Sequence, residues 1–140
     1  MAVHRILVAV DGSPPASRAL EWSNDLAAQL DATLVVMHVF EPLMAVGDRQ
    51  GPIDLPTLYD NAKRRLDGDW TAPLRERGTR YETKITEGRP VDAIADTAEE
   101  TRADLIVIGA RSMSIARQTL LGSTALRLPQ ETTRPVVVIH

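Results

Sequence analysis

Three runs of almost unbroken apolar residues constrain the fold of this chain more than any other feature. They span residues 5–10 (RILVAV), 33–39 (TLVVMHV) and 105–109 (LIVIG). A strand with one solvated face alternates apolar and polar residues, so continuous runs of this length indicate strands that helices cover on both faces. We therefore expect these three segments to be interior strands of a parallel sheet.

Two further segments have the pattern of edge strands. Residues 80–86 (RYETKIT) place Tyr81 and Ile85 among polar neighbours, which is typical of a strand with one wet face. Residues 136–139 (VVVI) follow Pro135, and a proline at the start of a strand suits an edge position. With the third and fifth strands at the edges, the predicted strand order is 3-2-1-4-5.

Segments with helical spacing separate the strands. After the first strand, Ser13 is the predicted N-cap and Pro14 the first helical residue. A second helical stretch occupies much of residues 55–77, where Gly68 and Pro73 predict a kink or two pieces.

Two more helices complete the alternation. The third is predicted over residues 90–101, and the fourth begins near Ser123 and is shortened or bent by Pro129. Strands that alternate with helices indicate an α/β fold with right-handed crossovers. We expect one domain over residues 1–140, a doubly wound five-stranded parallel sheet with helices on both faces.

Composition excludes several classes of function. The 140 residues include no cysteine, which excludes thiol catalysis and thiolate zinc sites. The net charge of −3 argues against a nucleic-acid partner, and the basic run of residues 63–65 lies among acidic residues as a solvated helix face would. No apolar run approaches a membrane span, and no signal peptide precedes the first strand. We therefore expect a cytoplasmic protein without a membrane partner.

The predicted strand order places a ligand site at one point of the sheet. Strands one and four are neighbours from which the chain winds in opposite directions, and open α/β sheets bind ligands beyond the carboxyl ends of such strands. Residues 11–13 (DGS) follow strand one and residues 109–112 (GARS) follow strand four. Two loops that are distant in sequence are thus expected to meet at one site.

The second of these loops has the character of a phosphate cradle. Gly109-Ala-Arg-Ser112 is followed by nine residues and then by Gly122-Ser123-Thr124, at the start of a helical segment. A glycine loop that leads into a helix presents backbone N–H groups and the positive end of the helix dipole to an anion. The spacing is neither that of a P-loop nor that of the dinucleotide-binding fingerprint.

Six short motifs, in order along nearly the whole chain, resemble those of the universal stress protein family. They are residues 6–13 (ILVAVDGS), 38–39 (HV), 87–90 (EGRP), 103–109 (ADLIVIG), 121–124 (LGST) and 134–139 (RPVVVI). The resemblance implies a Rossmann-like fold of the adenine nucleotide alpha hydrolase type. It also implies a homodimer joined through the last strand and, in the ATP-binding branch, the motif G-x-x-G-x(9)-G-[ST].

The resemblance assigns roles to residues of both loops. Asp11 and the backbone at Val39 would face adenine or ribose, and a divalent ion such as Mg²⁺ would be held by the nucleotide phosphates. The full set of predicted nucleotide-binding residues is Val10, Asp11, Gly12, Ser13, Val39, Gly109, Arg111, Ser112, Gly122, Ser123 and Thr124.

Ser112 departs from the ATP-binding motif, which has its second glycine there. A side chain where the backbone takes φ > 0 or closely approaches a ligand costs on the order of 1 kcal/mol or more, which corresponds to about tenfold in affinity. Against this, the Ser112 hydroxyl can donate to a phosphate oxygen, and Arg111 and Arg117 add positive charge.

Each of these residues also has a purely structural interpretation. Asp11 can cap its own turn, and Ser123 or Thr124 can serve as a helix N-cap. His38 fits a core histidine with its hydrogen bonds satisfied, and Arg111 and Arg117 fit solvated loop positions. The loop of residues 40–56 could supply Met44 and Val46 as a lid, or be a connection without a role.

The sequence supports binding rather than catalysis. It offers no nucleophile beside a base, no paired-carboxylate site and no metal-ligand cluster, so at most slow ATP hydrolysis is expected. The leading hypothesis is a small regulatory protein of the stress response that binds ATP, AMP or another adenine nucleotide. The alternative is a nucleotide-free module for dimerisation and protein contact, and a weaker one is a receiver-like domain, which lacks an acceptor aspartate at Glu87-Gly88-Arg89.

Overall fold

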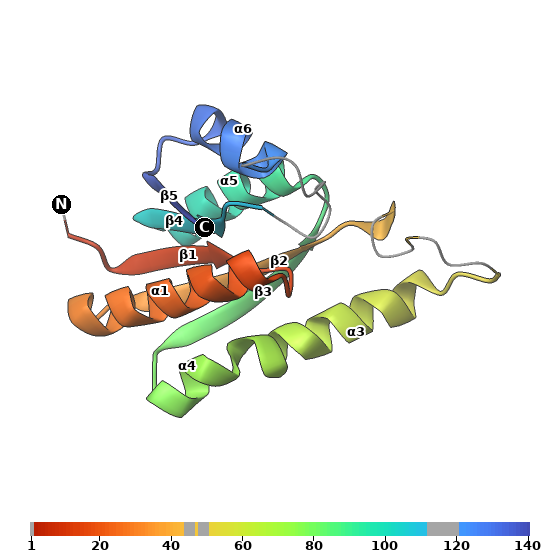
Figure 1. The fold of residues 1–140 in the computed structure, drawn as a ribbon, viewed down its shortest axis with the longest axis horizontal. Helices are drawn as coiled ribbons and strands as arrows, with labels where there is room; N and C mark the ends of the chain where they lie inside the picture. Colours follow the sequence, from red (N-terminus) through yellow and green to blue (C-terminus); the bar gives the residue numbers. More distant parts are fainter. Residues whose placement is uncertain (1, 44–46, 48–50, 112–120) are drawn as a thin grey trace.

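A five-stranded parallel sheet forms the centre of the structure (Figure 1). The computed structural model describes residues 2–43, 47, 51–111 and 121–140. The strand order is β3-β2-β1-β4-β5, as the apolar runs predicted. The strands are β1 (Arg5–Ala9), β2 (Thr33–Phe40), β3 (Tyr81–Glu87), β4 (Leu105–Gly109) and β5 (Val136–Ile139).

The sequence placed four strand limits one residue away from their positions in the structure. Val10 lies outside β1, β2 continues to Phe40, and β3 runs over 81–87 instead of 80–86. Ladder pairing sets these limits: residues 34–40 of β2 pair one by one with residues 81–87 of β3. The polarity of single residues does not reveal where such pairing stops.

The helices agree closely with the sequence prediction. The second helical stretch divides at Gly68, and the fourth helix is nine residues long with Pro129 inside it. None of the helices in the described segments is both long and apolar enough to cross a membrane. The helices are α1 (Pro14–Leu30), α3 (Leu55–Asp67), η1 (Asp69–Thr71), α4 (Ala72–Arg77), α5 (Pro90–Thr101) and α6 (Ser123–Glu131).

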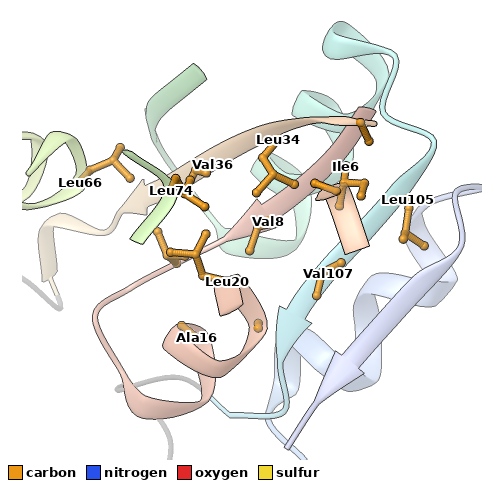
Figure 2. Close-up of a cluster of buried hydrophobic side chains, with 14 residues drawn as sticks. Ile6, Val8, Ala16, Leu20, Leu34, Val36, Leu66, Leu74, Leu105 and Val107 are labelled. Atoms are coloured by element: carbon orange, nitrogen blue, oxygen red, sulfur yellow. The ribbon is translucent and has the colours of Figure 1, made fainter. Parts of the chain in front are cut away.

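The two faces of the sheet pack against different helices. Along β1, Ile6 and Val8 face α1, α3 and α4, whereas Leu7 faces α5 and α6. Figure 1 shows these two helical layers on opposite sides of the sheet, and Figure 2 shows Leu66 and Leu74 packed near the strand residues of the first face. Burial on both faces explains why the interior strands are continuously apolar.

Helix starts are specified differently at α1 and α6. The Ser13 hydroxyl accepts a hydrogen bond from the Ala16 N–H at 3.4 Å, which confirms Ser13 as the N-cap of α1. At α6 the N-cap is Gly122, which has no side chain that could cap the helix. The interpretation of Ser123 or Thr124 as N-caps is therefore wrong, because both already lie within the first turn.

At the amino-terminal edge of the sheet, polar groups bond to one another. One carboxylate oxygen of Asp104 accepts hydrogen bonds from the backbone N–H groups of His4 (2.8 Å) and Arg5 (3.0 Å). These two bonds hold the pKa of Asp104 below its usual range. The Arg5 guanidinium also pairs with Glu82 of β3 at 2.7 Å. Side chains and backbone thus tie β1 to the segment before β4 at this edge.

Candidate functional site

A hollow of about 80 Å³ lies at the carboxyl-terminal edge of the sheet, where β1 and β4 are neighbours. Its wall combines the ends of β1, β2 and β4 with the starts of α1, α5 and α6. The lining residues are Ala9, Val10, Asp11, Ala16, His38, Val39, Glu41, Pro90, Ile94, Ile108, Gly109, Ala110, Arg111, Gly122, Thr124 and Ala125.

The structure brings most of the sequence-predicted residues into this wall. Val10, Asp11, Val39, Gly109, Arg111, Gly122 and Thr124 line the hollow. Gly12, Ser13 and Ser123 are not among its lining residues. Ser112, Arg117, Met44 and Val46 lie outside the described residues.

The loop after β1 is an Asx turn built around a glycine. The Asp11 carboxylate accepts a hydrogen bond from the Ser13 N–H at 3.0 Å, so the structural interpretation of Asp11 as a turn cap is confirmed. Gly12 has φ +82°, and a Cβ at this position would lie 2.8 Å from the Trp70 ring. Both the backbone conformation and the aromatic contact therefore require glycine.

The glycine after β4 is required by packing. A Cβ on Gly109 would lie 2.8 Å from the Pro15 carbonyl carbon and 2.9 Å from the Ala16 nitrogen. The end of β4 thus approaches the first turn of α1 at backbone contact. This gives Gly109 a structural role independent of any ligand.

Backbone hydrogen bonds join the start of α6 to the end of β4. The Gly122 N–H donates to the Ala110 carbonyl at 2.7 Å, and the Ala110 N–H donates to the Ile139 carbonyl at 2.7 Å. The N-terminus of α6 therefore faces the same hollow as the loop after β4, and its N-cap residue is a glycine without a side chain. The helix dipole and the first N–H groups favour an anion at this end of the hollow.

His38 lines the hollow and is also satisfied by the backbone. Its Nδ1 lies 2.7 Å from the Val10 carbonyl oxygen. Because a carbonyl oxygen only accepts hydrogen bonds, Nδ1 carries a proton, and in the neutral ring Nε2 carries none. The ring packs edge-on against Trp70, with 5.1 Å between ring centroids. Burial lowers the pKa of His38, against smaller opposing effects of the Val10 bond and Asp11. The Nδ1 bond agrees with the prediction of a satisfied histidine, but the expectation of a core position is wrong, because His38 is half-buried and lines the hollow.

Glu41 is the main residue of the wall that the sequence analysis missed. It lies directly after β2, and burial together with the negative charge of Asp11 raises its pKa. The available signal was an acidic residue directly after an interior strand, beside the strand that leads into Asp11. The apolar residues Pro90, Ile94 and Ala125 were also missed, because they match the core faces of their helices.

The wall of the hollow has two chemically different ends. Following the strand order, Glu41 and Asp11 come after β2 and β1, and Arg111 comes after β4 beside the α6 N-terminus. Carboxylates accept hydrogen bonds from hydroxyl or amino groups, whereas Arg111 and helix N–H groups suit an anion. The arrangement fits a ligand with a donor-rich end and an anionic end. In the described part of the chain, no three His, Asp or Glu side chains gather as metal ligands.

Comparison with known proteins gives a consistent result over the whole chain. The sequence model of the universal stress protein family matches residues 2–140. A universal stress protein of Thermus aquaticus is 32% identical, with 96% of this chain and 97% of that protein covered.

Solved structures show the same similarity. The universal stress protein of Archaeoglobus fulgidus in complex with dAMP is 28% identical over the full length of both chains, with a TM-score of 0.73. A universal stress protein in complex with cAMP is 26% identical, covers 100% of this chain and 98% of its own, and has a TM-score of 0.67.

Proposed function

The chain belongs to the universal stress protein family, and from this premise we propose that it is a regulatory protein that binds an adenine nucleotide in the hollow between β1 and β4. The observation that carries the proposal is the meeting of an acidic end and an anion-binding end in one hollow. Two relatives of the same family were solved with dAMP and cAMP, which supports an adenine nucleotide as the ligand class.

In this proposal the nucleotide lies with its phosphates toward Arg111, Gly122 and Thr124. The backbone N–H groups at the start of α6 and the Arg111 guanidinium neutralise the phosphate charge. Asp11 and the backbone at Val39 receive the adenosine part of the ligand. ATP with Mg²⁺ is one candidate within this class, in which case the ion binds through the phosphates.

Titration calorimetry of nucleotide-stripped protein with ATP, ADP and AMP tests this function. We expect saturable binding to at least one of the three. No heat and no shift of the thermal midpoint at millimolar nucleotide would overturn the proposal. That result would favour the alternative raised by Ser112, a nucleotide-free module for protein contact.

Two arginines allow a matched test of the phosphate end. Arg111 lines the hollow, whereas Arg127 is exposed on α6 outside its lining. Arg111→Ala should weaken nucleotide binding several-fold, and Arg127→Ala, which removes the same charge, should leave it unchanged. Equal affinities in the two variants would contradict the assigned orientation of the ligand.

The role proposed for Ser112 rests on the sequence motif alone, because Ser112 lies outside the described residues. If the serine strains the glycine loop, Ser112→Gly should tighten nucleotide binding by about tenfold. Unchanged affinity in the same titration would show that a serine is tolerated there.

We further propose that two copies of the chain associate through β5. This strand lies at the edge of the sheet, and all four of its residues are only partly buried in one chain. An open edge of apolar residues is a surface on which a second strand can pair. Light scattering at tens of micromolar should give the mass of two chains, and the mass of one chain would overturn this part.

A further inference from the structure

We propose that Trp70 is a positioning residue for the site, because its indole ring holds the loop after β1 in the shape that the wall of the hollow requires. Trp70 belongs to η1, between α3 and α4, and is not among the residues that line the hollow. The inference rests on the proposed function. It adds a route by which the outer helices α3 and α4 influence the affinity for a nucleotide.

The first step of the argument is that the Trp70 ring contacts two parts of the site at once. Its Cζ2, Cε2 and Nε1 atoms lie 2.8, 3.0 and 3.1 Å from the position that a Cβ on Gly12 would take. The ring therefore fills the space beside the Gly12 backbone. The same ring packs edge-on against His38 of β2, with 5.1 Å between the ring centroids. One side chain thus joins the loop after β1 to the last part of β2.

The second step is that β2 already fixes the start of this loop. The Val10 N–H donates to the Met37 carbonyl at 2.8 Å, and the Val10 carbonyl accepts the bond from His38 Nδ1 at 2.7 Å. Val10 and His38 both line the hollow. The imidazole that Trp70 contacts is therefore itself a support of the wall.

The third step concerns the residue at which the loop turns away from β2. Gly12 has φ +82° and directly follows Asp11, which lines the hollow. Glycine has the widest choice of backbone conformations, so its native conformation is stable only if its surroundings restrict it. The bond from the Ser13 N–H to the Asp11 carboxylate spans the turn, and the Trp70 ring limits the space from outside. Removal of the ring would leave the loop with more conformations than the one that forms the wall.

The fourth step is that the segment that carries Trp70 is held in place. Arg75 of α4 donates to the carbonyl groups of Asp67 and Gly68 at 3.0 and 2.6 Å, and to the Thr71 hydroxyl oxygen at 2.9 Å. These bonds close the break between α3 and α4 around η1. A ring on a fixed segment can restrain a neighbouring loop, whereas a ring on a loose one could not.

Core packing adds to this support from both sides of η1. Leu66 of α3 and Leu74 of α4 are buried in the same core cluster as the strand residues, near which Figure 2 shows them. Trp70 is partly buried against that cluster. The position of the indole is therefore set by the sheet and by α3 and α4 together.

Two tryptophan variants test the effect on affinity. Nucleotide-stripped protein is titrated by calorimetry with whichever of ATP, ADP and AMP binds the wild-type protein most tightly. Trp70→Ala should weaken this binding roughly fivefold or more, because the ligand must then order the loop itself. Trp70→Phe keeps an aromatic ring and should lose less. Urea unfolding identifies the conditions in which each variant is folded, and the titrations are made there.

Trp22→Ala is the matched control. Trp22 lies on α1, is 39% exposed and is not among the residues that line the hollow. The control removes the same side chain elsewhere on the same face of the sheet, so it should keep the wild-type affinity.

Fluorescence gives a readout that a purely structural role would not change. The chain has two tryptophans, so Trp22→Phe leaves the emission of Trp70 alone, and Trp70→Phe leaves that of Trp22. Excitation at the red edge of tryptophan absorption avoids the adenine ring. We expect the nucleotide to change the emission of Trp70 and to leave that of Trp22 as it was. Trp70 stays in place in Trp22→Phe, so this test does not depend on the folding of Trp70→Ala.

The outcomes separate this inference from the proposed function. Wild-type affinity in folded Trp70→Ala would overturn the role of Trp70 and leave the nucleotide site intact. Equal losses in Trp70→Ala and Trp22→Ala, or an emission of Trp70 that does not respond to the nucleotide, would also overturn it. Binding of none of the three nucleotides to the wild-type protein would overturn both proposals.

Discussion

The two edges of the sheet use carboxylates in opposite ways. At the amino-terminal edge, Asp104 accepts bonds from the backbone of His4 and Arg5, and its pKa lies below the usual range. At the carboxyl-terminal edge, Glu41 lines a hollow, and burial and Asp11 raise its pKa. A carboxylate whose charge is stabilised by backbone donors holds strands together.

The difference shows which edge can accept a ligand. At the amino-terminal edge, Asp104, Arg5 and Glu82 already bond to groups of the protein, so they are less available to an external molecule. At the carboxyl-terminal edge the charge of Glu41 is destabilised by its surroundings. A ligand that donates a hydrogen bond to this carboxylate would stabilise the charge. The following variants test this contrast, from the largest expected effect to the smallest.

Gly109→Ala should have the largest effect on stability. The new methyl group would meet the backbone of Pro15 and Ala16 below 3.0 Å, and backbone cannot move aside as a flexible side chain can. We expect a loss of about 2–3 kcal/mol in the free energy of unfolding, measured in urea, which is the upper part of the range for overpacking. A loss below about 0.5 kcal/mol would show that the carboxyl-terminal edge is looser than described.

Gly12→Ala and Gly78→Ala form a matched pair with the next largest expected effect on stability. Both glycines have positive φ, +82° and +74°, so alanine carries a similar conformational cost in each. Of the two, only Gly12 faces another group, the Trp70 ring, whereas no atom of the described residues lies within 4 Å of a Cβ on Gly78. Gly12→Ala should therefore be about 1 kcal/mol more destabilising in the same urea titration. Equal losses of unfolding free energy in the two variants would mean that the Trp70 ring does not restrict the space at Gly12.

Asp104→Asn should weaken the amino-terminal edge at neutral pH. The amide keeps an acceptor oxygen but loses the charge that strengthens the two backbone bonds, and solvent exposure reduces the effect to about 1 kcal/mol or less. The folded-state pKa is lowered, so this contribution is present above the ordinary pKa of the carboxyl and disappears as pH falls through the folded-state value. A difference between the two proteins that grows in acid would contradict this assignment.

Glu41→Gln should raise stability at neutral pH, whereas Asp104→Asn lowers it. The folded-state pKa is raised, so the ionised side chain opposes folding at neutral pH, and its replacement should give a gain of less than about 1 kcal/mol. Below the ordinary pKa of a glutamic acid the side chain is protonated in both states, and the gain should vanish. Urea midpoints at several pH values measure it, and a loss of stability at neutral pH would break the contrast between the two edges.

The last prediction concerns only how stability depends on pH, which His38→Asn tests apart from the constant cost of losing the Val10 bond and the Trp70 contact. The pKa of His38 is lowered on folding, so the wild-type protein loses stability as pH falls below the ordinary range of histidine. The variant lacks this loss, and the stability difference between the two proteins should shrink between pH 7.5 and pH 5.5. A difference that widens in acid would mean that protonated His38 is stabilised.

The sequence predicted most of the fold because the pattern of apolar and polar residues indicates which faces of each strand are buried. Continuous apolar runs identified β1, β2 and β4 as interior strands, and Pro135 and the alternation around Tyr81 identified the edges. Gly68 correctly predicted the division of the second helical stretch, and α6 is short, as predicted, although it continues past Pro129 to Glu131. The limits of strands were less accurate, since a strand ends where its neighbour ceases to pair with it.

The candidate site was predictable only in part. Asp11, Gly109 and Thr124 were found because strand order brings their loops together, and the structure places all three in the wall of the hollow. Glu41 was missed because a single acidic residue after a strand has no distinctive spacing. Ser13 and Ser123 were assigned to the ligand by their motifs, yet Ser13 caps α1, and neither is among the residues that line the hollow.

By itself the sequence determined the class of fold, the order of the strands and the edge of the sheet at which loops converge. These properties follow from apolar periodicity and chain connectivity, which act along the sequence. Only the tertiary structure decided which side chains share the hollow and what surrounds each charge. The pKa values of Glu41 and Asp104 move in opposite directions because burial and hydrogen-bond donors differ at the two edges, and those surroundings come from segments far apart in the chain.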